Sequence, residues 1–597
     1  MSKYNILVRI LDKIRTEAPA TYTVKYARND ADIEKANQAR ARAFIHLYLK
    51  VSFGLLDFTE REAFITDDTM DGGIDGYYIH KESKTIYFIQ SKFRTTEKNF
   101  EQKRIELAEI LIMDINRIMD GEENDENGNK YNGKIRQMMH SIREMDDIAR
   151  YRYKVILLAN IENIPQSKLK YLTGGYPVEV FDYELCYNKL IFPILSGTYF
   201  NASDLTINID LSNKNAGSKI SYTVKTEHSD CEITLLFVPT IEIAKVLHKY
   251  KNSILKYNPR SYLEFEGQKV NSSIRETILK KSTNEFALFN NGITMLSDET
   301  YINEKIGQKN KAQLHVVNPQ IINGGQTAYT LGKIYEENIT KNVVSIFQEK
   351  EVLLKIITFI QENGSDEKKS EKVQLIDEIS TATNLQTPVI GSDKFSNDKF
   401  HVRIQDLLFS RYGLLYERKR GEFGDGAELG YISRERILER NMFFRIYYAS
   451  NGEINRSIQK KLFLKNQSSI KLLENLNKLD NFYFGYYCFN QLLKKRNQQS
   501  KIEKNIYGMV YAMTRLYKPD SIVDYQDVVS DKISIFPHEW EKFTNTISKS
   551  DPRYMRTFLD KRTEQLITTF SEVRWYRSNN FEEDILNFYG TDERIFS

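Results

Sequence analysis

The sequence predicts a multidomain protein of mixed α/β and α+β class, and three observations lead to that prediction. The chain has 597 residues, which is too long for one hydrophobic core at about 150 residues per domain. Short apolar runs typical of strands alternate with helical patterns early in the chain, and amphipathic helical patterns dominate its end. We therefore expect an α/β domain over 1–195, a β-rich connector over 196–230, an α+β module over 231–440 and a mostly helical region over 441–597.

The composition is that of an ordinary globular protein with balanced charge. The chain carries 85 Lys and Arg against 81 Asp and Glu, a formal net charge of +4, so any nucleic-acid-binding surface must be a local patch. Cys186, Cys231 and Cys488 are far apart in apolar or aromatic surroundings, which disfavours a disulfide framework or a cysteine zinc site. The sequence has neither a secretion signal nor an apolar run of the roughly 18 residues that span a bilayer. We expect a cytoplasmic protein with no membrane partner.

The first domain is expected to centre on a helix and a hairpin. Residues 30–51 begin with a capping Asp and carry an apolar face, which predicts a helix. Residues 76–80 and 85–91 are rich in aromatic and β-branched side chains around a polar turn, which predicts a β-hairpin. The elements expected further on are a charged helix over 97–119, a polar loop over 121–133, a helix to about 148, and buried strands at 154–159 and 178–181 around a short helix near 167–172.

The hairpin brings an acid, an amide and an ammonium group onto one face. If the strands pair symmetrically about the turn, Asp75 lies directly opposite Gln90, and directly opposed residues point to the same face. Gln90 and Lys92 share that face because the side-chain period of a strand is two. A turn one residue longer or shorter would shift the pairing by one residue and place Asp75 on the face opposite to Gln90 and Lys92. With the even turn, Asp75, Gln90 and Lys92 converge.

The segments DGGIDGYYI and FIQSKF of this hairpin resemble the active-site hairpin of the PD-(D/E)XK nuclease superfamily. The resemblance is to its Mrr-like branch, in which glutamine replaces the usual second acid. It implies a restriction-endonuclease-like α/β/α domain with Asp75 as the metal-binding acid, Gln90 at the variant second position and Lys92 as the motif lysine.

Residues 231–440 carry a second resemblance, to the abortive infection phage resistance (AIPR) family. Four segments carry it in order: FNNGITML at 289–296, NPQIINGGQTAYTL at 318–331, ISTATNLQTPV at 379–389 and YERKRGEF at 416–423. The resemblance implies a role in bacterial defence against phage.

Phosphodiester hydrolysis by such a site needs a divalent cation, and Mg²⁺ prefers oxygen ligands. Asp75 and the amide oxygen of Gln90 are the expected ligands, with Glu34 or Asp71 as further candidates, and the expected cofactor is Mg²⁺ or Mn²⁺. Lys92 would stabilise developing charge or position the attacking water. The alternative is a surface hairpin in which the aspartates make local turn hydrogen bonds while Gln90 and Lys92 face solvent.

A second candidate site follows from the NGGQT segment. Its glycines stand directly before a helical run, so backbone N–H groups at the helix start could hold a phosphate, although no Lys follows them as in a Walker loop. The candidate contacts for nucleic acid or phosphate are Asn291, Asn323, Gly324, Gly325, Gln326, Asn384, Arg418, Lys419 and Arg420. The alternative is a structural Gly-Gly connector, with amides in turns and caps and a solvated basic loop.

These observations favour a metal-dependent nuclease that hydrolyses phosphodiester bonds, with double-stranded DNA as the expected substrate, in anti-phage defence. Cutting both strands of a duplex takes two sites, so a dimer or larger homo-oligomer is expected, and a phage-derived trigger is a further candidate partner. Two alternatives stay open. One is a catalytically silent sensor or adaptor for nucleic acid or a phage component, because Gln90 removes one negative charge from the site. The other is an RNA-cutting toxin.

Overall fold

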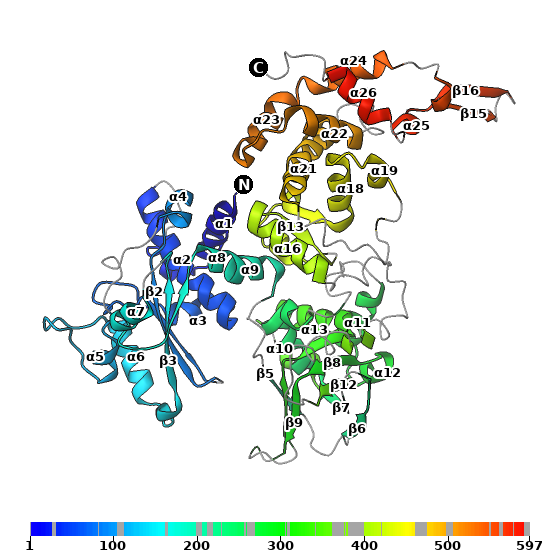
Figure 1. Ribbon diagram of the computed structural model, residues 1–597. Coiled ribbons are helices and arrows are strands. Elements are labelled where there is room, and N and C mark those ends of the chain that lie inside the picture. Colours follow the sequence, from blue (N-terminus) through cyan, green and yellow to red (C-terminus); the bar gives the residue numbers. More distant parts are fainter. Residues whose placement is uncertain are drawn as a thin grey trace. The chain divides into compact units, whose positions relative to one another are not determined.

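The computed structural model describes most of the chain (Figure 1). The described residues are 2–26, 32–81, 83–103, 113–161, 165–198, 206–211, 219–227, 230–255, 258, 269–304, 306, 311–340, 342–360, 375–376, 378–379, 399–419, 421–459, 462, 475–496, 506–547, 551–559, 565–576, 578 and 580–589.

The chain divides into two compact units that are not simply consecutive in sequence. The first unit comprises Met1–Asn397 and Lys419–Arg436, and the second comprises Asp398–Arg418 and Ile437–Ser597. The first unit therefore holds the predicted 1–195 domain, the 196–230 connector and most of the 231–440 module.

The N-terminal part of the first unit is built on a four-stranded sheet in the order β1-β2-β3-β4. Its strands are β1 (Gly76–His80), β2 (Thr85–Ser91), β3 (Arg152–Leu158) and β4 (Val178–Phe181). The strands β1 and β2 pair antiparallel, and the other neighbours pair parallel. Gly76 lies opposite Ile89 and His80 opposite Thr85, which confirms the symmetrical hairpin register.

Helices cover both faces of this sheet (Figure 1). The helix α2 (Ile33–Phe53) begins at its N-cap Asp32, whose side chain accepts the Lys35 N–H, and confirms the helix expected there. It packs on one face, where the Phe53 ring contacts Tyr78 and Tyr87. On the other face, Tyr77, Ile86 and Phe88 share a core with α5 (Ile115–Met119), α6 (Gly133–Arg143) and α7 (Gln166–Leu172).

The prediction of one long charged helix over 97–119 is wrong. The structure has α4 (Glu97–Glu101) and α5 (Ile115–Met119), with a non-helical stretch at 102–103 and 113–114 and the residues between outside the described ranges. The remaining helices here are α1 (Lys3–Thr16), α3 (Phe58–Ala63), α8 (Tyr183–Cys186) and α9 (Phe192–Ser196).

The central part of the first unit contains two further sheets, in the orders β5-β10-β9 and β11-β8-β12-β7-β6. The strands are β5 (Thr206–Leu211), β6 (Ile220–Val224), β7 (Cys231–Pro239), β8 (Ile293–Ser297), β9 (Glu299–Asn303), β10 (Ala312–Val317), β11 (Gln320–Asn323) and β12 (Glu351–Phe359). The predicted connector supplies β5 and β6, each at the edge of one sheet. Their polar, alternating sequences suit edge strands, because one side of each is open to solvent.

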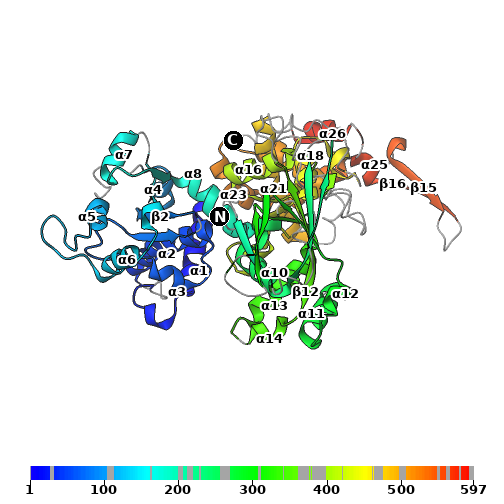
Figure 2. The same ribbon diagram turned by 90° about the horizontal axis from the view of Figure 1, so that it is seen from below.

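The helices α10 (Thr240–Tyr250) and α13 (Gly325–Asn338) lie side by side against the five-stranded sheet (Figure 2). A Cβ atom on Gly332 would stand 2.9 Å from Leu247 Cβ, so only glycine allows the two helices to approach this closely. Further helices of this part are α11 (Lys269–Lys280), α12 (Phe286–Phe289) and α14 (Val343–Phe347).

The second unit is mostly helical around an aromatic core, as expected. Its helices are α16 (Lys399–Tyr412), α18 (Arg440–Ser450), α19 (Ile454–Ser457), α21 (Leu476–Arg496), α22 (Ile506–Tyr517), α23 (Tyr525–Lys532), α24 (Phe536–Thr546), α25 (Glu572–Tyr576) and α26 (Asn580–Tyr589). Tyr483, Phe484 and Tyr486 are buried in this core. The strands β13 (Leu415–Glu417) and β14 (Ile437–Glu439) pair parallel, and β15 (Met555–Leu559) and β16 (Leu566–Phe570) form a hairpin.

Among the described residues, no helix is both long and apolar enough to cross a membrane.

Exchanging the two helical glycines Gly332 and Gly133 for alanine should have opposite effects. Gly332→Ala overpacks the α10–α13 contact and should lower the free energy of unfolding by about 1–3 kcal/mol. Gly133→Ala, where a Cβ meets nothing within 4 Å, should leave stability unchanged or raise it by up to about 1 kcal/mol. Urea unfolding followed by circular dichroism measures both. Equal midpoints for Gly332→Ala and the unmodified chain would contradict the close contact.

Candidate metal centre

Residues 66–75, called the acidic loop below, lead into β1 and are tied to the hairpin by their backbone. The N–H groups of Thr66 and Asp67 both donate to the Asp75 carbonyl, at 3.0 and 3.1 Å. The Asp75 N–H donates to the Ile89 carbonyl at 2.9 Å. The two ends of the loop therefore meet at Asp75, beside the first pair of the hairpin.

The middle of the acidic loop turns sharply through left-handed conformations. Gly72 and Gly73 have φ of 63° and 74°, and Met70 has φ of 60°, a region that costs a non-glycine residue free energy. A Cβ on Gly72 would stand 3.1 Å from the side chains of Ile118 and Tyr131. Glycine is thus needed at position 72 for its backbone angle and for this tight contact.

The polar segment expected as a loop over 121–133 braces the acidic loop at its end. The Asn132 N–H donates to the Met70 carbonyl at 2.9 Å, and Asn132 Nδ2 donates to the Thr66 carbonyl at 3.1 Å. Asn132 Oδ1 also caps α6 by accepting the N–H groups of Lys134 and Ile135. One side chain therefore connects the start of α6 with the acidic loop.

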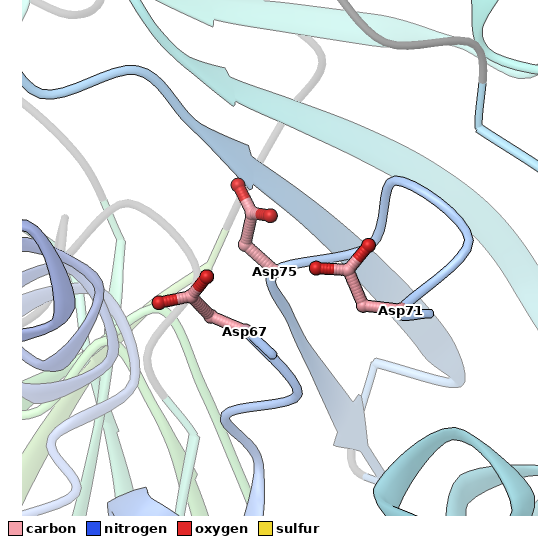
Figure 3. Close-up of side chains that lie close together, drawn as sticks. All are labelled: Asp67, Asp71 and Asp75. Atoms are coloured by element: carbon pink, nitrogen blue, oxygen red, sulfur yellow. The ribbon is translucent and has the colours of Figure 1, made fainter. Parts of the chain in front are cut away.

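Three carboxylates gather at this loop, those of Asp67, Asp71 and Asp75. One oxygen from each lies within 4.8 Å of the others, and the three side chains are turned towards a common space (Figure 3). Oxygen ligands stand about 2.1 Å from Mg²⁺, so neighbouring ligands of an octahedral ion lie about 3 Å apart. A bound cation would draw the three carboxylates closer together, and their all-oxygen donor set is of the kind that Mg²⁺ or Mn²⁺ prefers.

The electrostatics of the acidic loop favour a bound positive charge. Burial raises the pKa of Asp75 to about 7, with Asp67 and Asp71 adding to the effect, while the Ser91 N–H and Lys92 oppose it. Burial also raises the pKa of Asp71 to about 6. Both pKa values are raised because burial first, and the neighbouring acids second, disfavour negative charge here. A cation relieves the crowding of these negative charges.

The structure places the predicted hairpin residues as follows. Lys92 follows the end of β2, its N–H bonded to the Leu158 carbonyl, and its charge acts on both Asp71 and Asp75. Gln90 is 1% exposed, and its Nε2 donates to the Gly73 carbonyl at 2.9 Å. The amide of Gln90 therefore holds the acidic loop in place. Glu34 is exposed in the first turn of α2 and is not among the three gathered acids.

Asp67 is the member of this group that the sequence reasoning missed. The available signal was the acidic run TDDTMDGGID, in which Asp67, Asp71 and Asp75 recur every four residues. Arg42 of α2 approaches Asp67, with Nε 3.4 Å from Oδ2, and its side chain is 15% exposed. Arg42 is therefore a second group at this site that the hairpin pattern did not indicate.

The glycines of the NGGQT segment serve a close backbone crossing. Gly324 has φ of 76°, and a Cβ there would stand 2.6 Å from the Gly292 carbonyl oxygen. A Cβ on Gly325 would stand 2.5 Å from Asn258 Nδ2. The segments at Gly292 and Gly324 thus cross in contact just before α13 begins.

The polar side chains near this crossing bond mainly to one another and to the backbone. Gln326 Nε2 donates to Asn271 Oδ1 at 2.7 Å, and Asn323 Oδ1 accepts the Gly324 N–H. Lys419 is 2% exposed, and its Nζ donates to the Asn258 carbonyl at 2.8 Å. Asn291 is exposed and Arg418 half-buried, whereas Asn384 and Arg420 lie outside the described residues.

Comparison with known proteins identifies the family of this chain. The family model described as AIPR protein matches residues 255–565, more than half of the chain, and the chain belongs to the AIPR family. All four AIPR-like segments lie within the match, which confirms that resemblance and suggests a role in abortive-infection defence against phage. No curated protein and no solved structure matches the chain. The acidic loop lies outside the matched residues.

Removing the charge of Asp75 should change how stability depends on pH. Its raised pKa means that the folded, metal-free chain loses stability as pH rises from about 4, the unfolded value, to about 7. Asp75→Asn cannot ionise, so in chelator its stability relative to the unmodified chain should grow by roughly 2 kcal/mol between pH 5 and pH 8. Thermal or urea unfolding at the two pH values measures this difference.

Asp68→Asn is the matched control, because Asp68 is a neighbouring acid that pairs with Lys25 and has a lowered pKa. It should show no such gain. An Asp75→Asn difference that is the same at both pH values would show that Asp75 is not a destabilised carboxylate.

Proposed function

We propose that the N-terminal part of the chain is a metal-dependent nuclease that hydrolyses phosphodiester bonds and acts in the anti-phage role of the AIPR family. Mg²⁺ or Mn²⁺ would be held by Asp67, Asp71 and Asp75. The observation that carries the proposal is the convergence of these three carboxylates, two with raised pKa values, within reach of the charge of Lys92.

The proposed division of labour follows from the position of each group. A divalent cation, when bound, supplies positive charge for the phosphoryl oxygens as negative charge develops on them. The three carboxylates hold that charge at the end of the hairpin, and Gln90 keeps the acidic loop in position through the Gly73 carbonyl. Lys92 donates hydrogen bonds to a phosphoryl oxygen, and its ammonium group stabilises the same developing charge.

The topology of the surrounding sheet supports the proposal. An antiparallel hairpin followed by two parallel strands, with helices on both faces, agrees with the restriction-endonuclease-like domain that the hairpin sequence resembles. We take double-stranded DNA as the substrate, the cytoplasm as the location, and a homo-oligomer as the assembly, because a duplex has two strands to cut.

A catalytically silent sensor of nucleic acid is the second candidate. The position where many nucleases of this superfamily carry a second acid holds Gln90, whose Nε2 is bonded to a loop carbonyl. A site that lacks this acid can bind a phosphate backbone without cleaving it.

Mn²⁺ binding tests the metal centre directly. Each carboxylate supplies charge to the site, so Asp67→Asn and Asp75→Asn should each weaken Mn²⁺ binding at least about 10-fold. Electron paramagnetic resonance of free Mn²⁺ in titrations of the full chain measures this affinity. Asp68→Asn is the control and should bind as the unmodified chain does. Equal affinity in all four proteins would place the ion elsewhere.

Cleavage assays separate the nuclease from the sensor and from an RNase. The full chain is incubated with plasmid DNA or total RNA in Mg²⁺ or Mn²⁺, beside Asp75→Asn, Lys92→Met and Asp68→Asn. We expect DNA cleavage that falls at least about 100-fold in the first two variants, because each loses charge stabilisation at the phosphate. Asp68→Asn should stay within about twofold.

Two other outcomes would redirect the proposal. Cleavage of RNA alone, with the same dependence on Asp75, would make the protein an RNase. Phage protection that survives Asp75→Asn, in a chain that binds DNA without cutting it, would favour the sensor.

A further inference from the structure

One segment of the family-matched region belongs to the first unit although its flanks belong to the second. Lys419–Arg436, called the strap below, connects β13 to β14, and those strands pair within the second unit. The strap itself packs within the first unit. It therefore joins the chain of the second unit to the part that carries the acidic loop.

On its N-terminal-domain side the strap is tightly packed. The Phe423 ring meets Phe192 edge-on at 5.6 Å between ring centroids. A Cβ on Gly426 would stand 2.6 Å from the Leu195 carbonyl oxygen, so the two backbones are in contact. These contacts bring the next turn of the strap, which ends at Tyr431, onto helix α2.

On its other side the strap meets the central module. Lys419 Nζ donates to the Asn258 carbonyl at 2.8 Å, and Asn252 Nδ2 stands 3.5 Å from Asp425. Asp425 also faces a cavity of about 30 Å³ that it lines with Lys251, Lys333 and Glu336. The strap therefore contacts both the N-terminal domain and the central module.

Tyr431 starts a continuous chain of buried and half-buried polar contacts, called the relay below. Its hydroxyl accepts a hydrogen bond from Lys50 Nζ at 3.5 Å, and Lys50 also donates to Glu17 Oε1 at 2.6 Å. The other oxygen of Glu17 pairs with Arg61. These side chains come from the strap, α2, the end of α1 and α3, so the relay crosses most of the helices beside the hairpin.

From Arg61 the relay continues through His46 and Glu62. Arg61 Nε donates to His46 Nδ1 at 3.1 Å, so the other ring nitrogen, Nε2, carries the proton and donates to Glu62 at 3.2 Å. This matches a neutral imidazole, since burial lowers the pKa of His46 to about 4. Lys134 Nζ donates to the Glu62 carboxylate at 3.2 Å and to its carbonyl at 2.8 Å.

The relay ends where the acidic loop is held. Lys134 lies in the first turn of α6, whose N-cap Asn132 bonds to Met70 and Thr66 of the acidic loop. Buried charged groups are costly unless each keeps its partners. The relay therefore reaches from Tyr431 to Lys134, whose backbone N–H is capped by Asn132.

We propose that the strap regulates the metal centre: contact between Tyr431 and Lys50 sets, through the relay, the position of the acidic loop and its affinity for the cation. This inference rests on the proposed function. Displacement of Tyr431 from Lys50 would loosen the acidic loop, and a strap with this contact in place would hold it.

The test uses the full chain and the variants Tyr431→Phe, Lys50→Met and the double variant. Amide hydrogen exchange of residues 66–75, read by mass spectrometry, should rise about threefold in Tyr431→Phe, and Mn²⁺ affinity should fall by about the same factor. The double variant should match Lys50→Met, because both residues act through one contact.

Tyr525→Phe is the matched control. Tyr525 is also buried, but its hydroxyl has no hydrogen-bond partner among the described residues, so neither measurement should change. Exchange of residues 66–75 that is as slow in Tyr431→Phe as in Tyr525→Phe would overturn the strap proposal, whatever the Mn²⁺ affinity. A chain that binds no Mn²⁺ yet shows the faster exchange would overturn the metal centre and leave the coupling standing.

Discussion

The proposed metal centre of the N-terminal domain depends on one constraint. Three carboxylates are held close together where burial limits their contact with water. Burial, together with their mutual repulsion, raises the pKa values of Asp71 and Asp75. The backbone of the acidic loop resists that repulsion from two sides, through the hydrogen bonds to Asp75 and those from Asn132. A bound positive charge would relieve this crowding, which supports the proposed metal centre.

The central module uses its family-like motifs in a different way. Gly292 and Gly324 allow two backbones to cross in contact, and the nearby amides of Gln326 and Asn271 bond to each other. Lys419 is buried against the Asn258 carbonyl. These described residues of the AIPR-like segments therefore have structural roles, while the chemistry proposed for the chain lies in the N-terminal part. The strap connects the central module with the N-terminal part. Lys419 at its start contacts Asn258, and Tyr431 further along contacts Lys50.

The sequence was most informative where a short-range rule applies. The period of two along a strand and an even turn predicted the hairpin register from Gly76 to Ile89, and the apolar face after Asp32 predicted α2. The prediction of one helix over 97–119 failed because composition does not show where tertiary contacts interrupt a helix. Met113, which is not helical, donates its N–H to the Leu172 carbonyl at the end of α7. The edge positions of β5 and β6 were equally invisible, since their partners lie far along the chain.

The sequence by itself determined the hairpin and its register, the helical C-terminal region and membership of the AIPR family. These follow from local periodicity and from motifs that are continuous in the chain. Only the tertiary structure decided that Asp67 joins the acidic group and that Tyr431 meets Lys50. Those relations depend on backbone hydrogen bonds and packing between segments remote in sequence, and no local pattern of residues records which remote partner a side chain will find.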